Sequence, residues 1–165
     1  MLSHLLLFEW KFYSRKISFY VMLLSFFGFG ILIGTSARIG LQNITYNSPY
    51  VINLFFGMFS LTSLFPIVII ASQSLLREKD NKFDAVLYAT PITVINYFIS
   101  RFSIVFGIAI FTFLLFLVGY LISHLLTIDN NGNWGAFQLT HYFHSFFVIV
   151  VPNILFCTVI VCITA

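Results

Sequence analysis

The chain has 165 residues, of which 60% are hydrophobic and only 8% are charged, with a formal net charge of +3. A soluble domain has about 25% charged residues, so these proportions exclude a water-soluble protein, and eight Lys and Arg are too few for a nucleic-acid-binding surface. We therefore expect an all-α integral membrane protein, a helical bundle whose main solvent is lipid and which has no nucleic-acid partner.

The first predicted element is an interfacial helix over residues 2–16. A helical projection places polar and basic side chains on one arc and apolar side chains on the opposite arc. Glu9 breaks this pattern because it falls near the middle of the apolar arc. A carboxylate facing lipid is costly, so two interpretations stay open. Glu9 either meets a basic or polar partner elsewhere in the protein, or an imperfect helix rolls it into the headgroups.

Four long apolar stretches without Asp, Glu, Lys or Arg follow, and each is long enough to cross a bilayer as a helix. They predict transmembrane spans at about 17–37, 50–72, 102–126 and 143–165. The first stretch also resembles a signal peptide, but its apolar part is too long for a signal core and three more spans follow. Within it, Gly30 and Gly34 are spaced for a close helix contact, and we expect helix packing here.

The basic residues predict the orientation of the bundle. Seven of the eight Lys and Arg lie before the first span or in the connector 73–101, whereas Arg38 lies on the opposite side. The positive-inside rule then places the N-terminus and this connector in the cytoplasm. We expect a multi-pass protein of the cell membrane, the inner or plasma membrane.

The connector 73–101 predicts structure of its own. Asn81 is a suitable N-cap for a short helix, and Asp84 would interact favourably with the dipole of its first turn. Thr90-Pro91 ends this helix and starts the next one. One apolar stripe of the short helix is formed, at spacings of three and four, by Phe83, Val86, Leu87 and Thr90. Such a helix either docks a partner or rests on lipid as an ordinary interfacial helix.

The sequence lacks several signatures of enzymes. It contains neither a P-loop nor the metalloprotease and hydrolase motifs, so we expect no enzymatic activity, no catalytic residue and no cofactor. His124, His141 and His144 lie on the outer side, where histidines are ordinary, and we expect no metal site. The four spans also lack the ionisable residues that ion-coupled carriers use, which favours a permease with an external source of energy.

Several motifs together resemble a known family. Arg77-Glu78, Phe83-Asp84, the run from Leu87 to Thr93, and Tyr97 with Arg101-Phe102 are similar to the first cytoplasmic loop of exporter-type ABC transporter permeases, the ABC type-2 membrane domain family. Phe8-Glu9-Trp10-Lys11 resembles that family's interfacial elbow helix. The resemblance implies a six-span permease domain that pairs with a second permease half, as a homodimer or heterodimer, and is driven by a separate ABC ATPase.

The resemblance also implies that the loop forms a coupling helix that docks on the ATPase. The residues expected to take part are Arg77, Glu78, Phe83, Asp84, Leu87, Thr90 and Pro91. Because the chain stops within its fourth predicted span, we expect it to be the N-terminal portion of a longer permease, a family in which some members carry a peptidase-like domain. The sequence thus predicts a membrane subunit of an exporter of unknown substrate. Two alternatives are a non-transport anchoring or assembly subunit and the membrane part of a peptidase-fused protein.

Overall fold

The computed structural model describes residues 2–36, 45, 47–80, 94–127, 135 and 137–164. Within these ranges the secondary structure is helical and contains no strand, which confirms the all-α class. The helices are α1 (Leu2–Tyr13), α2 (Ile17–Ser36), α3 (Pro49–Ser60), α4 (Leu64–Asp80), α6 (Val94–Thr127), α7 (Leu139–Ser145) and α8 (Val151–Thr164). A 3-10 turn, Leu61–Ser63, joins α3 to α4, and a π-helical turn, Phe146–Val150, joins α7 to α8.

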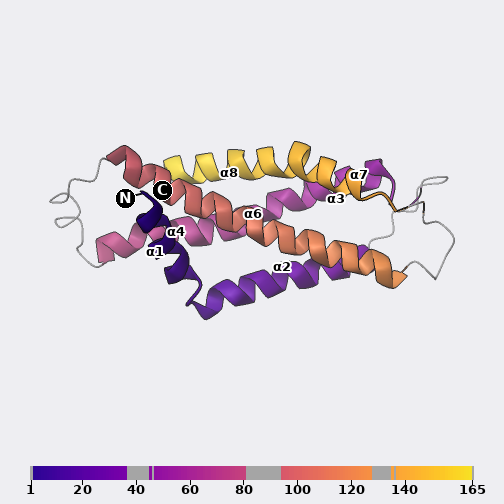
Figure 1. Cartoon of the computed structure of the whole chain (residues 1–165), viewed down its shortest axis with the longest axis horizontal. Helices are drawn as coiled ribbons and strands as arrows, with labels where there is room; N and C mark the ends of the chain where they lie inside the picture. The colour runs from indigo at the N-terminus through magenta and orange to yellow at the C-terminus, as the bar shows by residue number, and fades with distance from the viewer. Residues whose placement is uncertain are drawn as a thin grey trace.

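Four helical segments among the described residues are long and apolar enough to cross a membrane, as the sequence predicts. They are Ile17–Ser36, Pro49–Gln73, Tyr97–His124 and Leu139–Thr164. Successive segments run in opposite directions, so that α1, the end of α4, the start of α6 and the end of α8 lie at one end of the bundle (Figure 1). We call this the α1 end, and the opposite end the far end.

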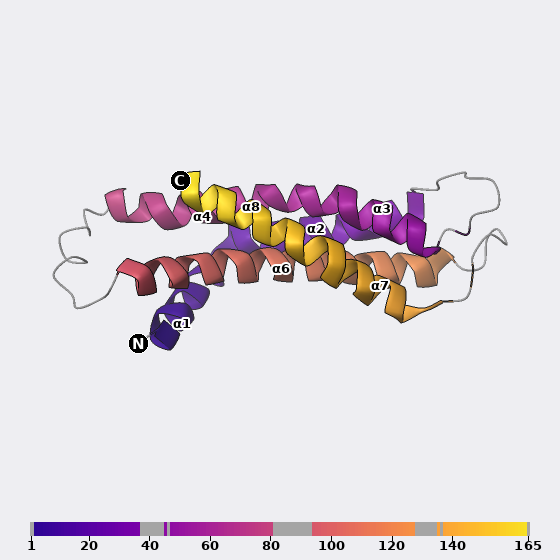
Figure 2. The same cartoon turned by 90° about the horizontal axis from the view of Figure 1, so that it is seen from above.

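The helix α6 is central to the bundle. It packs against α1, α2, α4 and α8, and Figure 1 shows it passing between α2 and α8. Its 34 residues give a length of about 51 Å, which exceeds the roughly 30 Å hydrocarbon core of a bilayer. At the α1 end, both α4 and α6 extend well beyond the level at which α2 begins (Figure 1). Figure 2 shows α1 lying obliquely to the bundle at that level.

Aromatic side chains fill the core between α3, α6 and α7. The Phe56 ring meets Phe113 edge-on at a centroid distance of 5.7 Å and meets Tyr120 edge-on at 6.0 Å. Tyr120 and Tyr142 are also neighbours, with centroids 6.2 Å apart. Edge-to-face pairs of this kind add to the stabilisation from packing, and in lipid packing replaces the hydrophobic effect as the force that holds helices together.

Glycines allow α2 and α6 to approach closely. A Cβ at Gly30 would lie 3.0 Å from the backbone nitrogen of Tyr120 and closer still to the Phe116 carbonyl oxygen. A Cβ at Gly34 would collide with the side chain of Ser123. From the opposite side, a Cβ at Gly119 would lie 3.2 Å from the backbone nitrogen of Ile31. Only glycine fits at such distances, so these positions set the spacing of the two helices.

The second and fourth spans each contain an irregular turn. The 3-10 turn Leu61–Ser63 comes shortly before Pro66, and the π-helical turn Phe146–Val150 comes shortly before Pro152. Proline has no backbone N–H and leaves a carbonyl of the preceding turn without its helical partner, which explains breaks at these places. Near the breaks, Asn153 Nδ2 donates a hydrogen bond to Ser60 Oγ at 2.8 Å. The two interrupted spans are therefore bonded to each other.

Candidate functional site at the junction of α1, α4 and α6

The junction is organised around an ion pair between α1 and α6. Nη1 of Arg101 donates to Oε1 of Glu9 at 2.9 Å. The Arg101 side chain is only 10% exposed and the Glu9 side chain only 6%. Of the two interpretations that the sequence leaves open for Glu9, the structure therefore supports the one with a basic partner. Both charges are largely removed from water, and the pair compensates part of the cost of burying each of them.

A tyrosine on the same helix also holds the guanidinium of Arg101. Arg101 Nε donates to the hydroxyl oxygen of Tyr97 at 3.2 Å, and the guanidinium carbon lies 5.1 Å from the centre of the Tyr97 ring. Tyr97 precedes Arg101 by four residues, the spacing at which side chains on a helix become neighbours. Arg101 is thus held by contacts on two sides, which orients it toward α1.

Two more hydrogen bonds fasten α1 to α4. The Tyr13 hydroxyl donates to the backbone carbonyl of Ile70 at 3.2 Å, and Lys16 Nζ donates to Oε1 of Gln73 at 2.9 Å. The ammonium of Lys16 also lies 4.4 Å from the centre of the Phe12 ring, within range of a cation–π interaction. The N-terminal helix and the turn after it therefore hold α4 and α6 together.

This junction adjoins the predicted coupling segment. The helix α4 ends at Asp80 and α6 begins at Val94, so the two helices that α1 fastens together are those on either side of 81–93. Arg77 and Glu78 lie on the last turns of α4. The other predicted coupling residues, Phe83, Asp84, Leu87, Thr90 and Pro91, lie outside the described residues, and the coupling helix stays a prediction.

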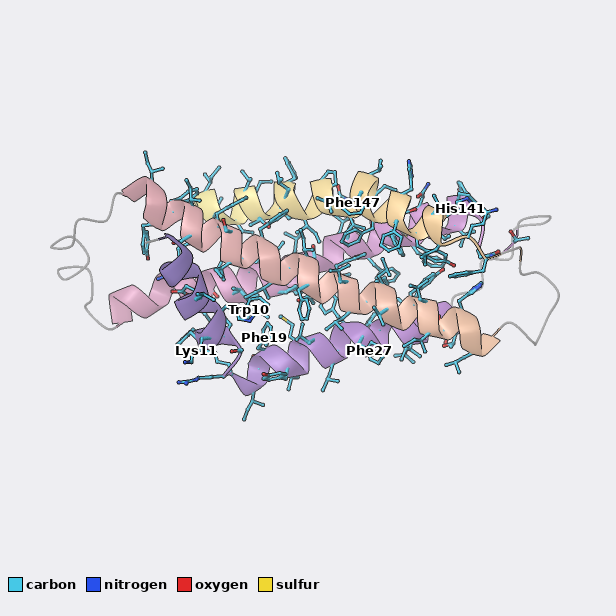
Figure 3. The ribbon with its side chains drawn as sticks, viewed as in Figure 1. Trp10, Lys11, Phe19, Phe27, His141 and Phe147 are labelled. Carbon is cyan, nitrogen blue, oxygen red and sulfur yellow. The ribbon has the colours of Figure 1, made fainter. Side chains whose placement is uncertain are left out.

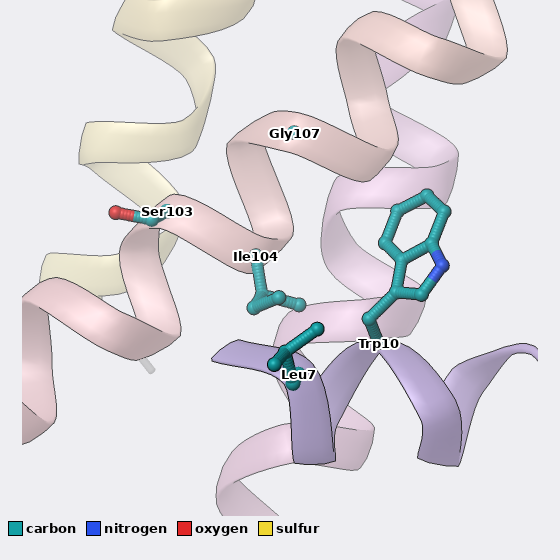
Figure 4. A pocket seen from close by; sticks show the side chains of 5 residues that line it. All are labelled: Leu7, Trp10, Ser103, Ile104 and Gly107. Carbon is teal, nitrogen blue, oxygen red and sulfur yellow. The ribbon is translucent and has the colours of Figure 1, made fainter. Parts of the chain in front are cut away.

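The open spaces near the junction are apolar. A cavity of about 60 Å³ lies between α4, α6 and α8, with Arg101, Val105 and Cys162 among its lining residues. A larger groove of about 320 Å³ lies between α1 and α6 and is lined chiefly by apolar side chains and Gly107 (Figure 4). The described residues contain no group of three His, Cys, Asp or Glu that could hold a metal ion. The described part of the junction consists of an ion pair, hydrogen bonds and apolar contacts between helices.

Some residues of the junction were not expected from the sequence. Arg101 has a place in the predicted loop motif, but the sequence does not name it as the partner of Glu9, and it does not indicate Tyr13 or Gln73 at all. One signal was available for Arg101: it is the basic residue directly before the third apolar stretch. Gly30 and Gly34 lie away from this junction, against α6. Figure 3 shows Trp10 of α1 on the side of that helix that faces the bundle, where its ring lies 6.1 Å from that of Phe111.

Comparison with known proteins gives one match. The model of the family described as ABC-2 family transporter protein matches residues 5–165. This range includes most of α1 and all four membrane-crossing segments. No curated protein and no solved structure matches the chain.

Proposed function

The chain belongs to the ABC-2 transporter family, and on that premise we propose that it is the membrane permease subunit of an ATP-driven exporter, a transport component that works with a separate ABC ATPase. The observation that carries this proposal is the family match, which extends over most of the N-terminal helix and the four spans. The four spans contain no Asp, Glu or Lys, and Arg101, near the α1 end of the third span, is paired with Glu9. This supports an energy source outside the membrane, because ion-coupled carriers use ionisable residues inside the bundle.

The proposal includes an orientation with the α1 end in the cytoplasm. Lys11, Arg15 and Lys16 lie on or directly after α1, and Arg77 and Lys79 lie near the end of α4, so the basic residues gather at this end. A bias of this kind is typical of the cytoplasmic side of a membrane protein. The ATPase, a cytoplasmic protein that binds ATP, then meets the bundle at the segment 81–93.

The coupling mechanism follows from the connections of this segment. Phe83 and Leu87 are proposed to enter a groove on the ATPase, while Arg77, Glu78 and Asp84 make polar contacts around it and Thr90-Pro91 aims the short helix. A displacement of the segment acts on α4 and α6, the helices on either side of it. Because α1 is bonded to both, we propose that the three helices move together and pass the displacement into the membrane.

The proposal also includes a second permease half, as a homodimer or heterodimer. The outward faces of α2 and α8 carry large exposed apolar side chains, including Leu24 and Phe29 on α2 and Phe156 and Ile163 on α8. Such faces are suited to lipid or to the helices of another subunit. The substrate would pass through a path that the assembled halves form between them.

Co-expression with an ABC ATPase tests the proposed function. The protein and the ATPase should co-purify, and vesicles that contain both should hydrolyse ATP faster than the ATPase alone. An ATPase with its Walker-A lysine replaced is the control for the ATP-dependent signal. If no ABC ATPase associates with the protein in its native membrane, the transport proposal is wrong and an anchoring or assembly role would replace it.

A further inference from the structure

The groove between α1 and α6 is open and apolar. It is lined by Leu7 and Trp10 of α1 and by Ser103, Ile104 and Gly107 of α6, and has a volume of about 320 Å³. The space beside Gly107 is open, because a Cβ at this position would meet no atom within 4 Å. Figure 4 shows the Ser103 hydroxyl directed away from the Trp10 ring, so the space between the two helices is bordered by hydrocarbon.

The groove lies where the bundle meets the edge of the bilayer. A three-residue turn joins the helix α1 to Ile17, the first residue of the first span, and α1 lies at the level where that span begins (Figure 1). Leu7 is 66% exposed and Trp10 is 42% exposed, so both are open to the surrounding phase. Filling an apolar space of this size with water is unfavourable, because the water would find few polar partners. A lipid acyl chain is the apolar molecule available at this level.

Two basic residues, Lys11 and Arg15, come shortly after the groove residues Leu7 and Trp10 in the sequence. Lys11 comes four residues after Leu7 and therefore lies on the same face of the helix, and Arg15 lies in the turn that follows Tyr13. Both side chains are exposed, and neither forms an ion pair with another described residue. Figure 3 places Lys11 at the outer edge of the bundle. Lys16, in contrast, is engaged with Gln73.

From these observations we propose that the groove binds one anionic phospholipid. An acyl chain lies between Trp10 and Gly107, and the phosphate is held by Lys11 and Arg15, which attract anionic headgroups at the membrane surface. The bound lipid then fills the open groove between α1 and α6. This site depends on the membrane location of the chain and is independent of any ATPase partner.

Fluorescence of Trp10 tests the proposal. The chain has two tryptophans, so Trp134→Phe leaves Trp10 as the reporter. The full chain is reconstituted in phosphatidylcholine vesicles that contain a small fraction of brominated phosphatidylglycerol or the same fraction of brominated phosphatidylcholine, since bromine on an acyl chain quenches a neighbouring indole. We expect the anionic lipid to quench more strongly, with a preference of about fivefold for each basic residue that contacts the phosphate.

Two variants locate the lipid. Gly107→Phe fills the groove and should abolish the excess quenching by phosphatidylglycerol, whereas Gly28→Phe is the matched control, because Gly28 is also a helical glycine with open space around its Cβ. The double variant Lys11→Gln and Arg15→Gln changes no packed side chain and should reduce quenching by the anionic lipid to that by phosphatidylcholine. This second variant keeps the test valid if Gly107→Phe does not insert.

Three outcomes would overturn the proposal. Equal quenching by the two brominated lipids in the Trp10 reporter protein means that only unselective boundary lipid lies there. Unchanged excess quenching in Gly107→Phe places the lipid outside the groove. A preference for phosphatidylglycerol that survives the loss of Lys11 and Arg15 means that these residues do not hold its headgroup.

Discussion

Glu9 and Arg101, which are 92 positions apart in the sequence, form an ion pair 2.9 Å long in which both side chains are almost fully buried. Its position explains how a carboxylate is tolerated on the apolar arc of α1. Because Arg101 belongs to α6 and lies seven positions after Val94, the pair connects the N-terminal helix to the third span close to the segment proposed to bind the ATPase.

Removing the carboxylate should destabilise the bundle. Glu9→Gln removes the charge that pairs with the buried guanidinium of Arg101 in this contact, and breaking a buried ion pair costs about 3–5 kcal/mol. Replacing both residues, as Glu9→Leu with Arg101→Met, should restore much of the loss because both charges of the pair are then removed together. The melting temperatures of the unmodified protein, the single variant and the double variant are compared by thermal unfolding in detergent, followed by fluorescence-detected size exclusion. Gln138→Ala, an exposed position next to α7 at the far end, is the control, and a Glu9→Gln melting temperature equal to that of the control would refute the prediction.

The close contact of α2 with α6 should fail when Gly30 gains a side chain. Gly30→Leu forces a Cβ into the backbone of Phe116 and Tyr120, and overpacking of this kind costs about 1–3 kcal/mol or more. Gly28→Leu, two residues away on the same helix, is the matched control because a Cβ there meets nothing within 4 Å. The two variants are compared by their melting temperatures in detergent. If both lose the same stability, the glycine contact does not set the helix spacing.

The hydrogen bond between the interrupted spans should contribute modestly. In Asn153→Leu the donor to Ser60 Oγ is lost, and interhelical hydrogen bonds in membranes are worth about 0.6 kcal/mol on average. A double-mutant cycle with Ser60→Ala isolates this pairwise energy. Thr164→Val serves as the reference, since the Thr164 hydroxyl bonds only to carbonyls of its own helix. A coupling energy of zero would show that Asn153 and Ser60 act independently.

The predicted coupling helix should control association with the ATPase. Burying a Phe side chain is worth roughly 1.5–3 kcal/mol, so Phe83→Ala should weaken ATPase binding by about one to two decades. Pro91→Ala should also weaken binding, because it lets the short helix run on into the next helix and misaims Phe83. Co-purification of the ATPase at matched permease levels is the measurement. Binding at the unmodified level in Phe83→Ala, Phe83→Asp and Pro91→Ala alike would favour a helix that simply rests on lipid.

Orientation can be measured independently of function. With Cys157 and Cys162 replaced, single cysteines are introduced at Asn81 and Asn131 and treated in intact cells with a thiol reagent that does not cross the membrane. We expect labelling at position 131 and none at 81 until the cells are opened, because the bias of basic residues places 81 in the cytoplasm. The reverse pattern would invert the proposed topology.

The spans were predictable because their signal is local. Each is a run of apolar residues without Asp, Glu, Lys or Arg, and length alone then indicates a membrane helix. The Gly30 and Gly34 spacing likewise indicates a helix contact, but no local feature names α6 as the helix on the other side. Gly119 was missed because no second glycine lies four residues before or after it, so it forms no recognisable motif. Even so, α2 packs on Gly119 as closely as α6 packs on Gly30.

The partner of Glu9 was not predictable for a different reason. Its position on the apolar arc shows that a partner is needed, but the choice of Arg101 depends on how α1 lies against α6, a contact between segments far apart in the sequence. The prolines show a similar limit. Pro66 and Pro152 indicate breaks in two spans, but whether the backbone tightens into a 3-10 turn or widens into a π turn depends on the packing around it.

The regularity of α6 gives this helix a distinct mechanical character. From Val94 to Thr127 it is a continuous α-helix without proline, whereas the second and fourth spans are interrupted at Leu61–Ser63 and Phe146–Val150. If the bound ATPase displaces the protruding start of α6, we expect this helix to tilt as one rigid unit. The tilt would be centred on the close contact between α2 and α6 at Gly30 and Gly119. The second and fourth spans each have an irregular turn near mid-length, so we expect these two spans to bend there when α6 tilts.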